Sequence, residues 1–311
     1  MSRRRSRFLS ALPLLVLAFA PRARAQACCA GGSAVTPARL ELHEDYAVGT
    51  SLHATDVTGS FTATGAYVSN PAGTGEGDFE ADLFATARFL RRGQATLLVP
   101  GIATYRTVPG LSDFGGGLGD LNLSARWDFV EAAESQVVPG IAVLAGATFP
   151  TGRPPDAPSA SALSANATGI GAYQLTLGVA LEKILGEHVL VNLTGLVSQR
   201  LPRTVSQGGV TVDETLGLQL FAIAAAGWVF DDGIAVALSG TFTGEEDAVV
   251  DGQRVPQSGR SQTTLAVSTS IPLSDEWRIA GSLFDELQIA GLGANQPIGL
   301  GLTFTVLRTW S

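Results

Sequence analysis

Hydrophobic and polar residues alternate with a period of two along most of the chain from residue 59 onward. The clearest example is the segment 120–129, where Leu121 and Leu123 alternate with Asn122 and Ser124. A period of two sends successive side chains to opposite faces of a β-strand. Strands of about nine to eleven residues with one apolar face can cross a bilayer when they are tilted. The pattern therefore predicts membrane-spanning strands.

The same alternation recurs in twelve segments, which we expect to be antiparallel strands. The segment 214–230 is the least regular of them. The predicted strands are residues 59–69, 78–90, 94–107, 120–129, 137–150, 170–183, 188–201, 214–230, 234–243, 261–273, 277–284 and 297–310.

The connections between these strands alternate in length. The short ones are residues 91–93, 131–135, 184–187, 231–233 and 274–276. The longer ones are residues 70–77, 108–119, 151–169, 202–213, 244–260 and 285–296. Bacterial outer-membrane barrels have short periplasmic turns and longer outer loops. Because the alternation keeps its phase through an even number of strands, both chain ends are expected on the periplasmic side.

Residues 26–58 precede the predicted barrel. Leu40, Leu42, Tyr46 and Val48 show some alternation, but a thirteenth strand would make the strand number odd. We therefore expect a periplasmic N-terminal segment at 26–58, which pairs partly with the barrel or enters it, followed by the barrel at 59–311.

Composition supports the same fold class. Hydrophobic residues make up 45% of the chain, charged residues 15%, and the mean hydropathy is +0.25. After Ala20, no uninterrupted apolar run reaches the roughly 18 residues that a transmembrane helix needs. Strands closed into a barrel solve this problem, because each turns one face to lipid. We expect an all-β fold, a closed antiparallel transmembrane β-barrel of about twelve strands; a soluble β-sandwich is the alternative.

The N-terminus has the features of a secretory signal peptide, residues 1–25. Arg3-Arg4-Arg5 precedes an apolar stretch of thirteen residues from Phe8 to Ala20, and Ala23-Arg24-Ala25 fits a signal-peptidase site. An uncleaved anchor and lipid modification of Cys28 are the alternatives. Export of a β-barrel predicts the outer membrane of a Gram-negative cell, with outer-membrane lipid and the barrel-assembly machinery as partners.

Aromatic residues gather at the ends of the predicted strands. One set lies beside the short turns or at the C-terminus: Phe89, Trp127, Phe129, Trp228, Phe230, Trp277 and Trp310. A second set lies near the opposite ends: Tyr67, Phe79, Tyr105, Phe149, Tyr173 and Phe242. Amphipathic rings suit a membrane–water interface, so we expect a girdle at each.

The chain offers little catalytic chemistry. His43 and His53 precede the predicted barrel, and His188 follows a short turn. His43-Glu44 begins like a zinc-protease motif, but Ala47 stands where the second histidine is required. No metal or cofactor is expected, and the net charge of −8 argues against nucleic-acid binding. The protein is not expected to be an enzyme; a membrane hydrolase using His188 is the alternative.

Charged residues on the polar face of the predicted strands would line the lumen: Glu80, Asp82, Arg88, Arg106, Arg126, Asp128, Glu182, Arg200 and Arg278. Two interpretations stay open. These charges select solutes, as charged rings do in pores, or they pair and fill the barrel, because twelve strands leave limited room. The acidic run Glu245-Glu246-Asp247 is expected in a solvated outer loop.

Two motifs carry a family resemblance. The run from Gly117-Leu118-Gly119-Asp120 to Arg126-Trp127, and the later Phe149-Pro150-Thr151-Gly152, resemble outer-membrane barrels of the "phenol degradation meta-pathway" family and its transporter-like relatives. These carry Gly-x-Gly-Asp before a strand with Lys or Arg and an aromatic residue, then Leu-Pro-Thr-Gly. The resemblance implies a barrel of about twelve strands that passes small hydrophobic or aromatic molecules. Such barrels usually end in an aromatic residue, whereas this chain ends Trp310-Ser311.

These features favour an outer-membrane channel for passive passage of small solutes, including hydrophobic or aromatic ones. The alternative is a structural or surface-interaction barrel with a filled lumen and no transport.

Overall fold

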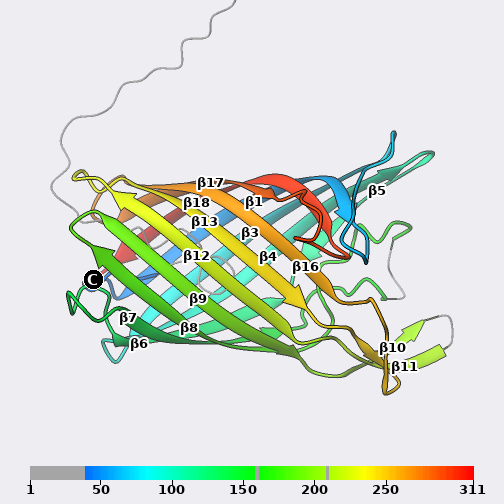
Figure 1. Ribbon diagram of the computed structural model, residues 1–311, viewed down its shortest axis with the longest axis horizontal. Helices are drawn as coiled ribbons and strands as arrows, with labels where there is room; N and C mark the ends of the chain where they lie inside the picture. The colour runs from blue at the N-terminus through cyan, green and yellow to red at the C-terminus, as the bar shows by residue number, and fades with distance from the viewer. Residues whose placement is uncertain (1–38, 158–160, 208–209) are drawn as a thin grey trace, which may run out of the picture.

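The computed structural model describes residues 39–157, 161–207 and 210–311 (Figure 1). The predicted signal peptide and Cys28 lie outside the described residues. Within these ranges, no helix is long and apolar enough to cross a membrane.

Twelve long strands form one antiparallel sheet that closes on itself, because the first strand pairs with the last (Figure 1). The barrel strands are β1 (Tyr46–Phe61), β3 (Gly75–Phe89), β4 (Gly93–Val108), β6 (Leu121–Val130), β7 (Gly140–Phe149), β8 (Gln174–Leu185), β9 (Val189–Arg200), β12 (Gln219–Val229), β13 (Ala235–Glu245), β16 (Arg260–Pro272), β17 (Trp277–Glu286) and β18 (Pro297–Trp310). Closure leaves no unpaired sheet edge. The predicted fold class is confirmed.

The connections alternate in length as predicted. Strand pairs β3–β4, β6–β7, β8–β9, β12–β13 and β16–β17 are joined by short turns at one end, called here the short-turn end. The opposite, long-loop end carries the short strands β2 (Tyr67–Ser69), β5 (Leu111–Leu118), β10 (Arg203–Gln207), β11 (Val210–Thr215), β14 (Val249–Val250) and β15 (Gln253–Arg254). In Figure 1 the C-terminus lies at the short-turn end, and β5, β10 and β11 lie at the other.

The prediction for the first strand is wrong. The first barrel strand is β1, Tyr46–Phe61, and not residues 59–69, so most of the expected periplasmic segment 26–58 that the structure describes is part of the wall. Residues 59–61 of β1 instead pair with β2 in a hairpin at the long-loop end. The strand number stays even, because β1 takes the place of the predicted spanning strand 59–69.

Three other strands begin three or more residues later than predicted. The segment 170–183 contains β8, which starts at Gln174. The irregular segment 214–230 contains the end of β11 and then β12, which starts at Gln219. The segment 137–150 contains β7, which starts at Gly140.

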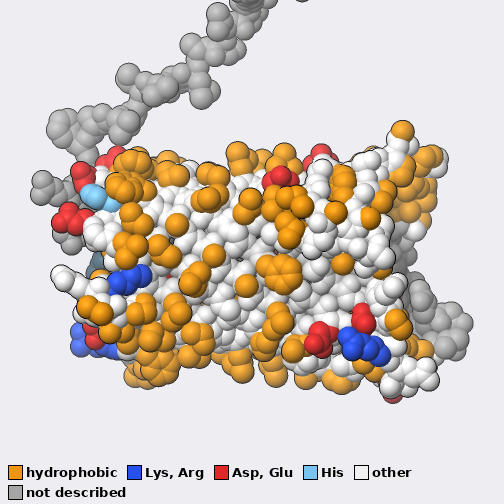
Figure 2. Space-filling view, viewed as in Figure 1, with side chains coloured by type: hydrophobic (Ala, Val, Ile, Leu, Met, Phe, Trp, Pro, Cys, Tyr) orange, Lys and Arg blue, Asp and Glu red, His pale blue; other side chains and the backbone are white. Residues whose placement is uncertain are grey.

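The outer surface of the barrel is apolar. Leu83, Leu177 and Leu283 are 62%, 62% and 66% exposed although each lies within a barrel strand. On the face shown in Figure 2, hydrophobic side chains are spread along the whole length of the wall, and the charged side chains lie mostly towards the ends. Because this much apolar surface is stable only against lipid, the barrel is a transmembrane barrel.

Candidate functional site

The lumen is lined by the strand positions that alternate with the lipid-facing ones. All nine predicted lumen charges occupy such positions, and they fall into three groups along the barrel. Arg88, Arg126, Asp128, Glu182 and Arg278 lie near the short-turn end, Glu80 and Asp82 near the middle, and Arg106 and Arg200 near the long-loop end.

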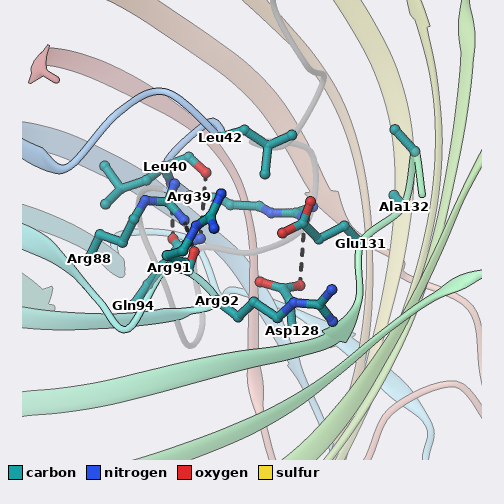
Figure 3. A pocket seen from close by; sticks show the side chains of 11 residues that line it. Arg39, Leu40, Leu42, Arg88, Arg91, Arg92, Gln94, Asp128, Glu131 and Ala132 are labelled. Atoms are coloured by element: carbon teal, nitrogen blue, oxygen red, sulfur yellow. Dashed lines mark hydrogen bonds and ion pairs between the residues drawn. The ribbon is translucent and has the colours of Figure 1, made fainter.

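Residues 39–45, named here the mouth segment, occupy the short-turn mouth (Figure 3). The backbone N–H of Leu40 donates to Gln94 Oε1 at 2.9 Å, although the two residues are 54 positions apart. The Leu40 side chain is 3% exposed and packs with Ala47, Phe84 and Leu307. The mouth segment is therefore anchored by a strand-to-segment hydrogen bond and a small apolar core inside the barrel.

A buried ion-pair network joins this segment to the wall. Arg126 lies 2.7 Å from Asp128 and 3.0 Å from Glu182. Arg39 of the mouth segment contacts both carboxylates, with an ion pair to Glu182 and a 3.6 Å separation from Asp128. All four side chains are 12% exposed or less. Of the two sequence interpretations, mutual pairing holds for this part of the lumen.

A second set of contacts fixes the rest of the mouth segment. Arg278 lies 2.7 Å from Glu41 and 3.2 Å from Glu44. Arg88 donates through Nε to the backbone carbonyl of Glu44 at 2.8 Å and also donates to the carbonyl of Glu41. The remaining space beside the segment in Figure 3 is a cavity of about 20 Å³, which holds about one water molecule.

The middle of the lumen is more open. A cavity of about 110 Å³ lies against β6, β7, β8, β9 and β12. Its lining consists of Asn122, Ser124, Gly146, Thr148, Gln174, Thr176, Leu196, Ser198 and Phe221. Hydroxyl and amide groups dominate, and Leu196 and Phe221 supply an apolar side. This volume accommodates roughly three or four waters, or a small solute.

His53 faces the same part of the lumen from the opposite wall. The sequence prediction placed it before the barrel, which is wrong because β1 contains it. Its Nε2 lies 3.2 Å from Asp82 Oδ2, and its Nδ1 lies 3.0 Å from Thr303 Oγ1. The ring therefore bridges β3 and β18 across β1.

Charge pairs also line the wall of the lumen near the long-loop end. Arg106 lies 2.7 Å from Glu76 and donates to the backbone carbonyl of Leu163 at 2.9 Å. Arg200 lies 2.9 Å from Glu245, whose side chain is 5% exposed. The prediction that Glu245 belongs to a solvated loop is wrong, because it is the last residue of β13 and pairs inside the barrel.

The two motifs that carry the family resemblance meet at this end. Asp120 accepts hydrogen bonds from the N–H groups of Gly152 at 2.8 Å and Ile170 at 2.7 Å. Thr151 donates through its hydroxyl to the Gly119 carbonyl at 2.7 Å. A Cβ on Gly152 would lie 2.7 Å from the Thr168 carbonyl oxygen, so glycine is required there. Together these residues form a clasp between the β5–β6 connection and the long loop after β7.

The predicted aromatic residues of the short-turn end form local contacts on the outer face. The rings of Phe89 and Trp127 lie 6.1 Å apart. Arg308 stacks its guanidinium 5.7 Å from the Trp277 ring and 4.9 Å from the Trp310 ring. Cation–π contact of this kind orients indole rings at the rim, where we propose that the set forms a membrane girdle.

Sequence reasoning missed four lumen residues, Arg39, Glu41, Glu44 and His53, because it placed them in a segment before the barrel, which it expected to pair with the barrel or enter it, and assigned them no lumen contact. For His53 a signal was available: Ser51, His53 and Thr55 share one face of an alternating segment. In the described part of the chain, no group of three histidine, cysteine or acidic residues is placed to hold a metal ion.

The barrel is similar to solved outer-membrane structures. An outer membrane channel from Pseudomonas putida F1 superposes with a TM-score of 0.71 at 17% identity, covering 88% of this chain and 100% of that one. The β domain of the Bordetella autotransporter BrkA gives 0.49 at 9% identity over 86% of this chain and 99% of that one. A Pseudomonas aeruginosa FadL homologue gives 0.43 at 10% identity, over 86% and 90%. No family model and no curated protein matches the sequence. The first comparison supports the closed-barrel fold, and the apolar outer surface identifies this barrel as a transmembrane one.

Proposed function

We propose that the protein is a narrow outer-membrane channel for small solutes, and that the mouth segment closes its periplasmic end in the conformation described here. The observation that carries this proposal is the cavity of about 110 Å³ in the middle of the lumen, lined mainly by hydroxyl and amide side chains. Transmembrane barrels have polar interiors, which are water-filled in porins and plugged in others, so it is the unfilled space that favours passage of a solute.

The cavity lining suits small solutes that combine an apolar ring with a polar group. Phe221 and Leu196 offer apolar contact, while Ser124, Thr176 and Ser198 offer hydroxyl groups. Simple phenols have this character, and the sequence resemblance to barrels named for phenol degradation agrees with it. The Pseudomonas putida protein of similar fold is an outer membrane channel, which is compatible with the same role.

A non-enzymatic role agrees with the environment of His188, the histidine that a membrane hydrolase would require. Its Nδ1 lies 2.9 Å from the Val229 carbonyl oxygen, and its ring stacks on Trp228 at 5.2 Å. Both contacts hold the imidazole ring of His188 against the edge of the barrel wall.

Conductance in planar lipid bilayers tests the proposal. The Arg39→Ala/Leu40→Ala variant removes the ion pairs and the apolar anchor of the mouth segment, and we expect it to conduct at least several-fold more than the native chain. Arg254→Ala is the control, because Arg254 pairs with Asp247 on the exposed outer loop. Liposome swelling with phenol-sized solutes should show the same order.

The filled-lumen alternative is favoured by one observation, the buried ion-pair network at the short-turn mouth. If the native chain and the double variant both fold, as shown by heat-dependent gel migration, yet neither conducts nor admits small solutes, the channel proposal is overturned. A surface-interaction barrel is then the better description.

A further inference from the structure

A polar cluster lies on the lumen wall where β18, β1 and β3 run side by side (Figure 1). Strand register arranges its six side chains in two rows across the three strands. One row is Thr303, His53 and Glu80, and the other is Thr305, Ser51 and Asp82. All six occupy alternate positions of their strands and therefore face the lumen.

Asp82 is the centre of this cluster and is only half satisfied. Its Oδ2 lies 3.2 Å from His53 Nε2, and its side chain is 6% exposed. Its Oδ1 is buried and has no hydrogen-bond partner. Ser51 Oγ lies 3.1 Å from His53 Nε2 and 2.8 Å from Thr305 Oγ1, so the neighbouring hydroxyls are engaged with other groups. A buried carboxylate oxygen without a donor is costly, which indicates a missing partner.

Negative charge exceeds positive charge at this position of the lumen. Asp78, Glu80 and Asp82 follow one another on the inward face of β3. Among the described residues, His53 is the one basic side chain that forms an ion pair with any of these three carboxylates. With all three carboxylates ionised, even a protonated His53 leaves two negative charges uncompensated, and a proton shared between Glu80 and Asp82 still leaves one. In contrast, three carboxylates that lie nearer the ends of the barrel have arginine partners, namely Glu76, Glu182 and Glu245.

The wall beside the cluster carries small side chains. The neighbouring inward positions of β16 and β17 carry Ser268, Ser270, Ala280 and Ser282, which are all small. The hydroxyl of Ser270 is also buried without a hydrogen-bond partner.

We propose that this cluster binds a small ammonium-type cation from the lumen. The cation would donate one N–H to Asp82 Oδ1 and others to the Glu80 carboxylate and the nearby hydroxyl oxygens. A metal ion fits less well, because no three metal-ligating side chains converge within the described residues. An N–H donor supplies what the cluster lacks, which is positive charge together with a directed hydrogen bond. This site is independent of conduction, so it stands or falls separately from the channel proposal.

Thermal unfolding of the detergent-solubilised full barrel at pH 7 tests the site, with methylammonium, potassium or tetramethylammonium chloride added at constant ionic strength. A ligand that binds the folded state raises the unfolding temperature in a saturable manner. We expect methylammonium to raise it more than potassium, which carries no N–H, and more than tetramethylammonium, which has the same charge but no donor.

Two substitutions make the test specific. Asp82→Asn should abolish the methylammonium response, and Glu80→Gln should weaken it if Asp82→Asn fails to fold. Glu76→Gln is the matched control, because Glu76 lies on the same strand and face but already pairs with Arg106 at 2.7 Å. This variant should show the same methylammonium response as the native chain. Equal shifts with all three cations, no shift with methylammonium, or a response that survives loss of the cluster carboxylates would overturn the proposal.

Discussion

The two ends of the barrel are both crossed by charged side chains, but these charges have different partners. At the short-turn end, Arg126, Asp128 and Glu182 pair with one another and are 8% exposed or less. The long-loop end also has strand-borne pairs, Arg106 with Glu76 and Arg200 with Glu245. There, carboxylates hold a long loop as well, because Asp113 and Asp120 accept hydrogen bonds from backbone N–H groups of the long loop after β7. Strand-borne charges close one end, and loop-capping carboxylates organise the other.

This difference determines what holds each end in place. Arg126, Asp128 and Glu182 lie on β6 and β8 and are positioned by the register of the wall, so their contacts depend on the folded barrel. Loop-capping carboxylates are closer to water, where ionic and hydrogen-bond contributions are smaller and respond to salt and pH. We therefore expect the short-turn end to contribute to global stability and the long-loop end to local order.

The largest expected effect is at the short-turn network. Arg126→Ala leaves Asp128 and Glu182 with Arg39 as their remaining arginine, and breaking a buried ion pair costs about 3–5 kcal/mol. Urea unfolding in phospholipid vesicles should show a loss near that size. Arg254→Ala, in a pair whose arginine is 68% exposed, should cost less than about 1 kcal/mol. Equal losses would remove the distinction between buried and exposed pairs.

A second prediction concerns the apolar anchor of the mouth segment. Leu40→Ala should cost about 2–3 kcal/mol, because Leu40 packs against Phe84 and Leu307. Leu42→Ala is the matched control, since Leu42 is 62% exposed and Leu40 is 3% exposed. Hydrogen exchange of the Leu40 amide, which bonds to Gln94, should accelerate in the first variant and not in the second. Unchanged protection in Leu40→Ala would mean that the ion pairs alone hold the segment.

Most of the barrel could be predicted from sequence, because a period of two reports directly on which face of a strand each residue occupies. The nine lumen charges were placed by this rule alone. The first strand was missed because β1 has little contrast between its faces: Gly49, Ser51 and Thr55 point inward, and Thr50 and Ala54 point outward. The hairpin formed by residues 59–69 then looked like a spanning strand.

The pairing of those charges could not be predicted, because it depends on closure of the barrel. Arg39 and Glu182 are 143 positions apart, and Glu41 and Arg278 are 237 apart. No local pattern brings such residues together. The clasp is similar: the resemblance identified Asp120 and Gly152 as parts of two motifs, but only the fold shows that they bond to each other.

At the long-loop end, Asp120→Asn should have a smaller and more local effect. It replaces one acceptor oxygen with an amide, so either Gly152 or Ile170 loses its hydrogen bond at a cost of about 1–2 kcal/mol. Hydrogen exchange at these two amides should accelerate, while urea unfolding changes less than in Arg126→Ala. Asp231→Asn is the control, because the Asp231 side chain is 98% exposed in a short turn. A global loss of stability would show that the clasp supports the wall rather than the loop.

The smallest expected effect is the response of this loop to acid. The Ser161 hydroxyl and the N–H groups of Leu163 and Ala165 hold the pKa of Asp113 below its ordinary value of 3.8. Because the pKa is lowered in the folded loop, the contribution of Asp113 is fully present above about pH 4 and is lost as the pH falls through the folded pKa. Exchange rates at Leu163 and Ala165, corrected for intrinsic pH dependence, should therefore stay constant from pH 7 to pH 4 and rise below it. Asp113→Asn should show weaker protection at pH 7 and no acid step. The short-turn end provides the internal reference, which is read from hydrogen exchange at the Leu40 amide. If Leu40 also loses protection over this acid range, the two ends respond to acid together, and the contrast between them does not hold.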